Sequence, residues 1–256
     1  MSAASPFDAI AAEYAASRPG YPDAAFDFVV GTACLPPEAV LLEVGVGTGQ
    51  ATVGLADRGF AVVGLEPGAA MVAEARRRLS AYPRVEIRES SFEDWDPQGR
   101  RFHMLVSAQA YHWIDPALGT NKPLEVLCPG GWVALMWNVP GPRTESNPHS
   151  AIDEAYRRHA PTLLHRGAGG SAAAATGVTR QFEASGWYAN VVQRRFAWQR
   201  RYAPDEYTRL LGTFSDHLAL TEVSRAALLE EIGSAIRGAG VLDVAYETWC
   251  FLYQRL

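Results

Sequence analysis

The chain has 256 residues and a net charge of −5 at pH 7, from 23 Lys and Arg against 28 Asp and Glu. This acidic balance argues against a dedicated nucleic-acid-binding protein, which is basic as a rule. Hydrophobic residues make up 48% and charged residues 20%, as in an ordinary globular protein with one sizeable core.

Apolar periodicity predicts two helices near the N-terminus, at 6–17 and at 23–33. Beyond them, short apolar runs predict buried strands, and the stretches of helical spacing between these runs predict helices. The predicted strands lie at 40–44, 61–65, 85–88, 102–108 and 131–137, and the predicted helices at 50–58, 69–80 and 121–127. Strands and helices that alternate in this way are typical of a parallel sheet with helices on both faces.

The regular alternation ends after Asn138. The remaining pattern predicts a helical stretch at 148–164, a low-complexity surface loop at 166–177, a short helix up to 185, a strand near 188–198, two helices within 204–236 and a last strand at 241–254. We therefore expect two parts, with the N-terminal helices and a ligand-binding core in 1–138, and with a helical cap and the last strands of the same sheet in 139–256. The cap is expected over the carboxyl edge of the sheet, where open α/β sheets bind ligands.

The cysteines and histidines indicate neither a disulfide framework nor a zinc site. Cys34, Cys128 and Cys250 are an odd number and lie far apart, and neither a CxxC nor an HExxH pattern occurs. The N-terminal segment lacks the basic and apolar regions of a secretory signal, and no apolar run approaches the roughly 20 residues of a membrane span. We expect a cytoplasmic monomer or homodimer without a membrane or nucleic-acid partner.

The segment 41–50, LLEVGVGTGQ, places a glycine-rich turn between a predicted strand and a predicted helix. Glycines let the backbone approach a ligand closely because no Cβ intervenes, although such a turn can also serve packing alone. The spacing does not fit the GxGxxG of dinucleotide-binding proteins, since Gln50 or Thr52 takes the last position, and the lysine of a phosphate loop is missing. Glu43, at the strand end, would repel a pyrophosphate but attract a ligand with an ammonium and a sulfonium.

Glu43, Gly45, Gly47 and Gly49 resemble the first motif, E/DxGxGxG, of the class I S-adenosylmethionine-dependent methyltransferases. The turn LCPGG at 127–131 is similar to the LxPGG of the same family. The resemblance implies a Rossmann-like, doubly wound α/β fold with a mostly parallel seven-stranded sheet, an antiparallel last strand and a helical cap. It also implies S-adenosylmethionine as cofactor, S-adenosylhomocysteine as product, and no metal.

Further residues match the family in order along the chain. Glu66, followed by Pro67, ends the second strand where the family places an acid on the ribose diol, although a solvated or helix-capping glutamate is the alternative. Met71 falls where the family packs an apolar side chain on the adenine. Ser91 replaces the aspartate that the family uses for the adenine amine, so that contact is expected from Ser91 or from the backbone of Phe92. Ser91 could equally be a plain turn serine.

Candidate catalytic residues follow the fourth predicted strand, on which Ser107 is also expected at the cofactor site. The sequence QAYHW at 109–113 resembles a small-molecule subgroup that includes trans-aconitate methyltransferase-like proteins. His112 could accept a proton from an oxygen or nitrogen acceptor, because the ordinary histidine pKa is about 6.5. The aromatic face of Tyr111 could stabilise the sulfonium. Alternatively, Tyr111 and Trp113 form wall and core while His112 only hydrogen-bonds structure, since methyl transfer often needs positioning alone.

The N-terminal segment YAASRPGYP at 14–22 resembles the YxxxRPxYP entry of this subgroup. There a helix closes over the cofactor, so Tyr14 and Arg18 are expected near the cofactor carboxylate, which suits the planar Arg fork. A plain surface helix is the alternative. The basic run at 194–201 is expected to face solvent along a strand, with guidance of an acidic substrate as the alternative. Asn138 could line the pocket.

We therefore expect an enzyme that transfers a methyl group from S-adenosylmethionine to an oxygen, nitrogen or carbon atom of a small molecule. The alternative is a catalytically silent S-adenosylmethionine-binding or regulatory protein, which would keep the cofactor residues and lose an open acceptor cavity. A nicotinamide or flavin oxidoreductase uses a related sheet, but the glycine spacing argues against it.

Overall fold

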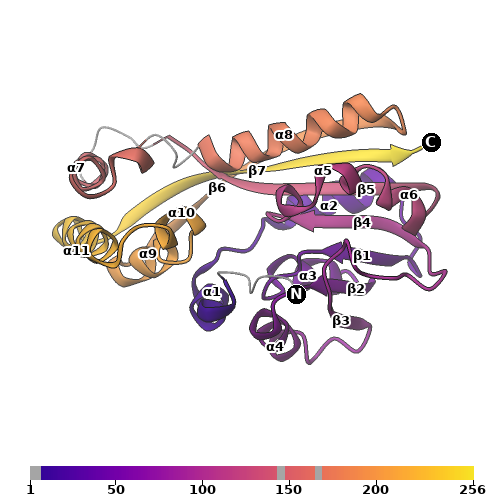
Figure 1. Ribbon diagram of the computed structural model, residues 1–256, viewed down its shortest axis with the longest axis horizontal. Coiled ribbons are helices and arrows are strands. Elements are labelled where there is room, and N and C mark those ends of the chain that lie inside the picture. The colour runs from indigo at the N-terminus through magenta and orange to yellow at the C-terminus, as the bar shows by residue number, and fades with distance from the viewer. Residues whose placement is uncertain (1–6, 143–147, 165–168) are drawn as a thin grey trace.

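The computed structural model describes residues 7–142, 148–164 and 169–256, and its centre is one seven-stranded sheet (Figure 1). The strand order is β3-β2-β1-β4-β5-β7-β6. The strands are β1 Val40–Val44, β2 Ala61–Glu66, β3 Val85–Glu89, β4 Phe102–Ala108, β5 Leu127–Pro140, β6 Tyr188–Tyr202 and β7 Leu242–Arg255. The pairs among β1 to β5 are parallel, whereas β7 is antiparallel to both of its neighbours, β5 and β6. The predicted Rossmann-like sheet with an antiparallel last strand is confirmed.

Helices cover both faces of this sheet. The helices of the described residues, those of the cap included, are α1 Ala11–Ser17, α2 Asp23–Ala33, α3 Gln50–Ala56, α4 Ala69–Arg78, α5 Pro116–Gly119, α6 Lys122–Val126, α7 His149–His159, α8 Gly169–Ser185, α9 Pro204–Leu211, α10 Ser215–Leu218 and α11 Glu222–Ala239, with short 3₁₀ turns η1 Asp8–Ile10, η2 Tyr111–Trp113 and η3 Pro161–Leu163. Leu41 packs in the cluster with Phe26 of α2, and its neighbour Leu42 packs in the opposite cluster with Phe182 of α8. Because both faces are covered, strand residues are buried on either side and read as continuous apolar runs.

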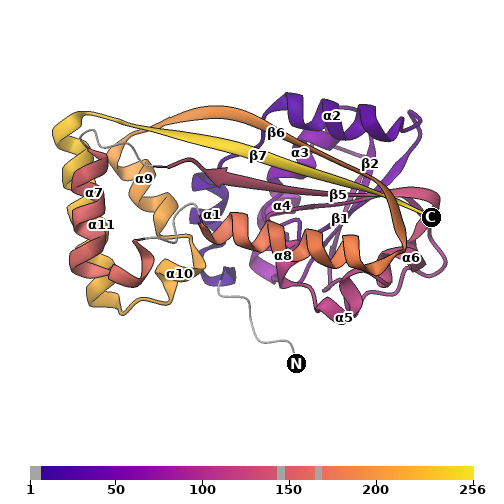
Figure 2. The same cartoon turned by 90° about the horizontal axis from the view of Figure 1, so that it is seen from above.

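Helices α7, α9, α10 and α11 form a cap beyond the carboxyl ends of the parallel strands (Figures 1 and 2). The cap has its own core, to which β6 contributes Tyr202 and β7 contributes Leu242 and Tyr246. The long strands β6 and β7 therefore hold the cap on the sheet, at the edge where ligands of such sheets bind.

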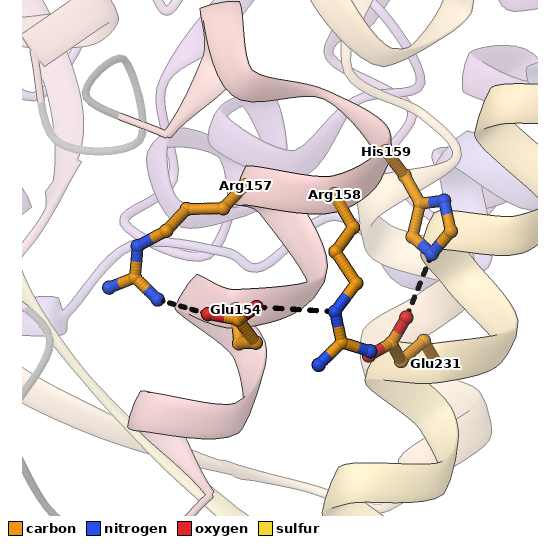
Figure 3. Close-up of polar contacts among 5 residues, drawn as sticks. All are labelled: Glu154, Arg157, Arg158, His159 and Glu231. Atoms are coloured by element: carbon orange, nitrogen blue, oxygen red, sulfur yellow. Dashed lines mark hydrogen bonds and ion pairs between the residues drawn. The ribbon is translucent and has the colours of Figure 1, made fainter.

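Polar side chains tie α7 to α11 on the cap surface (Figure 3). Glu231 of α11 bonds Arg158 at 2.5 Å and His159 at 2.8 Å, and Glu154 bonds Arg157 at 2.6 Å and Arg158 at 3.2 Å. Exposed ion pairs contribute little stability each, about 0–1 kcal/mol. This network therefore sets the alignment of the two helices, while the apolar cluster beneath it supplies the stability.

Two predictions for the second half of the chain are wrong. Of the surface loop predicted at 166–177, residues 169–177 belong to α8, with Ala175 fully buried against the sheet, and 166–168 lie outside the described residues. A run of small residues forms a helix here because the later turns of α8 bring Val178 and Phe182 onto the core. The region 204–236 holds three helices instead of two. Among the described residues no helix has the length and apolar character needed to cross a membrane.

Candidate functional site

The glycine turn between β1 and α3 has a backbone that only glycine adopts easily. Gly45, Gly47 and Gly49 have φ angles of +73°, +58° and +87°. A Cβ on Gly45 would lie 2.3 Å from the Cβ of Ala110, so the turn after β1 and the segment after β4 approach each other closely. A Cβ on Gly47 would lie 3.7 Å from Met71 and 3.9 Å from the Tyr14 ring. The turn therefore joins three of the predicted cofactor-binding segments at the carboxyl edge.

Glu66 ends β2 beside this turn and is 7% exposed. Its Oε2 accepts a hydrogen bond from the Gly47 amide at 2.9 Å, and its Oε1 accepts one from the Gly68 amide at 3.0 Å. Burial raises the pKa of this carboxyl, and the two amide donors oppose the rise. Each oxygen can accept a further bond, so the oriented carboxylate suits a diol.

Glu43, on β1, is buried with 1% exposure. Its Oε2 has no hydrogen-bond partner among the residues that the structure describes. Burial raises the pKa of this carboxyl to about 8, and the nearby Thr52 hydroxyl lowers it only in part. An unpartnered buried carboxyl needs a reason, and a cationic ligand group such as an ammonium would supply the missing donor. The residues present therefore fit the cofactor that the sequence implies.

Tyr21 is a neighbour of Glu43 that the sequence did not single out. Burial raises its pKa well above the ordinary value, and the charges of Tyr14 and Glu43 raise it further. Tyr21 stands in the YxxxRPxYP segment, so the resemblance offered a signal for it. Asp8 offered none. Its Oδ1 accepts from the amides of Ala70 at 2.7 Å and Met71 at 3.4 Å, which caps α4 beside Glu66.

Arg18 connects the N-terminal segment to the cap. Its guanidinium lies 4.6 Å from the ring centroid of Tyr14 and 4.4 Å from that of Phe214. It donates to the Thr213 carbonyl at 2.7 Å and to the Thr213 hydroxyl at 3.0 Å. Tyr14 thus lies at the glycine turn as expected, whereas the bonds that the structure shows for Arg18 are directed to the cap.

The residues predicted near the adenine and the ribose differ in burial and in hydrogen bonding. Met71 is buried near the turn, and Pro67 is exposed. The Ser91 hydroxyl donates to the Asp94 carboxylate at 2.8 Å and accepts from the Asp94 amide at 3.0 Å, the geometry of a turn serine. Phe92 is buried with its ring on Tyr111. This arrangement favours the turn role for Ser91.

Ser107 has a structural bond in the sheet. The residue is 1% exposed, and its hydroxyl donates to the carbonyl of Val44 at 2.8 Å, which links β4 to the end of β1. Just after β4, Gln109 adopts a φ of +63°, which is strained for a residue with a side chain. Its amide donates to the Met136 carbonyl and its side chain to the Asn138 carbonyl. These bonds fix how the following segment leaves the sheet.

Tyr111 and His112 are adjacent in η2 but face different surroundings. The Tyr111 hydroxyl donates to the Gly119 carbonyl at 2.7 Å, and the ring packs between Phe92 and Phe182. This placement favours the packing role for Tyr111, the alternative to a catalytic one. His112 is exposed, and its ring nitrogens have no hydrogen bond among the described residues. Even so, the surrounding protein lowers its pKa by desolvation, so the neutral imidazole dominates at pH 7.

Asn138 does not offer its side chain to a pocket. Its amide donates to the Gly20 carbonyl at 3.0 Å, and its Oδ1 accepts from Thr248 at 2.6 Å. Trp132 and Trp137 are buried, as expected for core residues. The arginines of the run 194–201 lie on the outer strand β6, where Arg201 bonds Asp243 twice. Among the described residues no cluster of His, Cys, Asp and Glu could hold a metal ion.

Comparison with known proteins adds to this geometry. Residues 41–131 match the family model of a methyltransferase domain. An uncharacterized methyltransferase of Mycobacterium tuberculosis is 32% identical over 133 residues, 52% of this chain and 52% of that protein. The chain thus spans about half the length of the curated relatives it matches first.

Two solved structures show the same architecture. A protein of Anaeromyxobacter dehalogenans described as a type II methyltransferase has a TM-score of 0.67 at 25% identity, over 92% of this chain and 97% of its own. A phosphoethanolamine N-methyltransferase of Haemonchus contortus, in complex with S-adenosylhomocysteine, has a TM-score of 0.55 at 14% identity, over 97% of this chain and 57% of its own. At that identity the second likeness concerns the fold alone.

Proposed function

We propose that this protein is a class I, S-adenosylmethionine-dependent methyltransferase that methylates a small molecule, because residues 41–131 match the model of a methyltransferase domain. The observation that carries the proposal is the pair of buried carboxyls, Glu43 and Glu66, on the two sides of a glycine turn with positive φ angles. A pyrophosphate offers neither carboxyl a hydrogen-bond donor. A ligand with an ammonium and a ribose diol would satisfy both.

When bound, S-adenosylmethionine supplies an electrophilic methyl group on its sulfonium. Glu66 would accept from the ribose hydroxyls, and Glu43 would accept from the ammonium group. Met71 and Tyr14, which line the turn at Gly47, would cover the cofactor and exclude water. The structure of the Haemonchus enzyme contains S-adenosylhomocysteine, so a protein with this fold can hold the product of the proposed cofactor. The residues up to 138 would hold the cofactor, and those from 139 onward would close over the acceptor.

His112 would serve the acceptor. It follows β4 at the carboxyl edge, two residues after Ala110, which touches the glycine turn. Its neutral imidazole can accept the proton of an acceptor hydroxyl or amine as the new bond to the methyl carbon forms. The acceptor would be a small molecule that reacts through an oxygen, nitrogen or carbon atom. A catalytically silent protein would bind the cofactor and show no transfer to any acceptor.

Calorimetry with S-adenosylhomocysteine and NAD tests the cofactor. We expect binding of the first and none of the second. The Glu66→Ala variant should bind S-adenosylhomocysteine more weakly by roughly 1.5–3 kcal/mol, the contribution of a hydrogen bond to a charged group. An Asp94→Ala variant, which changes an exposed carboxylate of the turn after β3, is the control. Tight NAD binding, or no effect of Glu66→Ala, would contradict the proposal. A transfer assay with labelled cofactor and small acids, phenols and amines then separates an enzyme from a silent binder.

A further inference from the structure

A cleft is lined by residues of α1, α9 and the end of β6. Figures 1 and 2 show α1 and α9 side by side. Its volume is about 450 Å³. Its polar lining consists of Glu13, Ser17, Arg200, Glu206 and Arg209, with two alanines of α1 as its apolar wall. We call it the α1–α9 cleft. It contains none of the residues assigned above to cofactor or acceptor.

The hydroxyl of Ser17 is the first sign that the cleft receives a ligand. Ser17 is 5% exposed, and its Oγ has no hydrogen-bond partner among the residues that the structure describes. A serine hydroxyl at the end of a helix commonly bonds a backbone carbonyl one turn earlier, and this one does not. A buried hydroxyl without a partner is unfavourable unless a ligand completes it.

The charges are the second sign. Arg200 and Arg209 line the same cleft as Glu13 and Glu206, yet within the described parts of the chain these four side chains form no ion pair with one another. Arg200 stacks on the Tyr202 ring at 4.7 Å, and Glu206 accepts from the Ala203 amide at 2.9 Å. A simple anion would meet two carboxylates here, and a simple cation would meet two guanidiniums. A ligand that carries both a negative and a positive group would satisfy both pairs.

We propose that the α1–α9 cleft binds a small zwitterion with one carboxylate and one ammonium group, as in a free α-amino acid. Arg200 and Arg209 bind the carboxylate, to which the Ser17 hydroxyl donates. Glu13 binds the ammonium group. The alanines face the aliphatic part of the ligand, and the volume is larger than a small amino acid, so that water fills the rest of the cleft.

Three matched probes test the charge requirement on the full chain by saturation-transfer NMR and calorimetry. They are L-2-aminobutyrate, butyrate as its carboxylate half and propylamine as its ammonium half. We expect the amino acid to bind at least about ten-fold more tightly than either half, as the loss of one charge-assisted bond predicts. No saturable binding of the amino acid, or equal binding of butyrate, would overturn the proposal.

Variants locate the site. Arg209→Met and Glu13→Gln should each weaken binding about ten-fold, while Arg180→Met, which removes an exposed arginine of α8, should leave it unchanged. Ser17→Ala separates binding from packing. Loss of the unpartnered hydroxyl should raise the melting temperature and at the same time weaken binding of the amino acid. If the serine is purely structural, the substitution should change the melting temperature alone.

Occupancy of the cleft should also affect the opposite side of α1. Tyr14 of this helix lies at Gly47, and the Ala15 carbonyl accepts from Arg78 of α4 at 2.6 Å. A ligand that holds α1 against α9 should therefore tighten S-adenosylhomocysteine binding several-fold, a coupling that rests on the proposed function. If the protein binds no S-adenosylhomocysteine, the proposed function fails while the probe experiments still decide the cleft. If both ligands bind without influence on each other, the coupling is wrong.

Discussion

Glu43 combines a raised pKa with a buried position in which its Oε2 has no hydrogen-bond partner among the described residues. At pH 7 a carboxyl with a pKa of about 8 is mostly protonated in the folded protein, whereas in the unfolded chain it is ionised. The folded state therefore binds one more proton, so this residue lowers the stability of the unliganded protein as the pH rises from about 5 to 8. A bound ammonium group would lower the pKa of Glu43, because it favours the ionised carboxylate, and would thereby remove this loss of stability.

The Glu43→Gln variant tests this balance. It should melt at a higher temperature than the wild type at pH 8 without ligand, because no proton has to be taken up. It should also bind S-adenosylhomocysteine more weakly. In the wild type, affinity should rise with pH between about 6 and 8, with proton release on binding, and this dependence should be absent in the variant. Melting curves and calorimetry in buffers of different ionisation heat measure both effects. An identical pH dependence in the two proteins would exclude Glu43 as its source.

His112 is exposed and has a lowered pKa, so its proposed role has a distinct pH signature. With saturating cofactor, turnover should rise with pH with a midpoint below the usual histidine pKa of about 6.5, because only the neutral imidazole accepts a proton. His112→Ala should lower turnover by about 10²–10⁴-fold with little change in cofactor affinity.

His112→Gln distinguishes a base from a residue that only orients the acceptor. A glutamine can hydrogen-bond the acceptor but cannot take its proton at neutral pH. If His112 is the base, His112→Gln should resemble His112→Ala. If it orients, His112→Gln should keep most activity. Full activity of His112→Ala at every pH would leave the residue without a catalytic role.

At the scale of elements, α8 forms because its alanines favour a helix and its contacts with the core offset the cost of its glycines. Gly177 lies inside it, is exposed, and has open space where a Cβ would point. Gly177→Ala should therefore stabilise the protein by roughly 0.5–1 kcal/mol, since alanine loses less backbone freedom on folding. Gly59 is the matched control, because it has the same open space but a φ of +82°. Gly59→Ala should destabilise. Urea unfolding of both variants checks the prediction, and stabilisation by both would show that backbone conformation is not the cause.

At the scale of the whole molecule, Arg18 is the contact through which the N-terminal segment reaches the cap. Its bonds to Thr213 join residues 195 positions apart, and its ring contacts join Tyr14 to Phe214. Cofactor that binds beneath Tyr14 should therefore slow hydrogen exchange in α9 and α10 as well as in α1.

The Arg18→Met variant should lose this long-range protection. Methionine keeps much of the apolar bulk but cannot donate to Thr213 or attract the aromatic faces. With bound S-adenosylhomocysteine, α1 should still be protected while α9 and α10 exchange as in the unliganded protein. Arg180→Met is the control and should behave as the wild type. Equal protection of the cap in all three proteins would mean that the cap is coupled by another route.

The sequence alone determined the alternating core and the glycine turn, because both depend on neighbours in the chain. Apolar runs set the strands, and Gly45, Gly47, Gly49, Glu43 and Glu66 lie at strand ends, which parallel pairing brings to one edge. Only the tertiary structure decided which side chains meet across long separations. It placed Asp8 on α4, joined Arg18 to Thr213, enclosed Tyr111 and made a helix of 169–177. A local sequence pattern predicts that a residue is buried or hydrogen-bonded. Only the folded chain determines which distant residue it packs against or bonds.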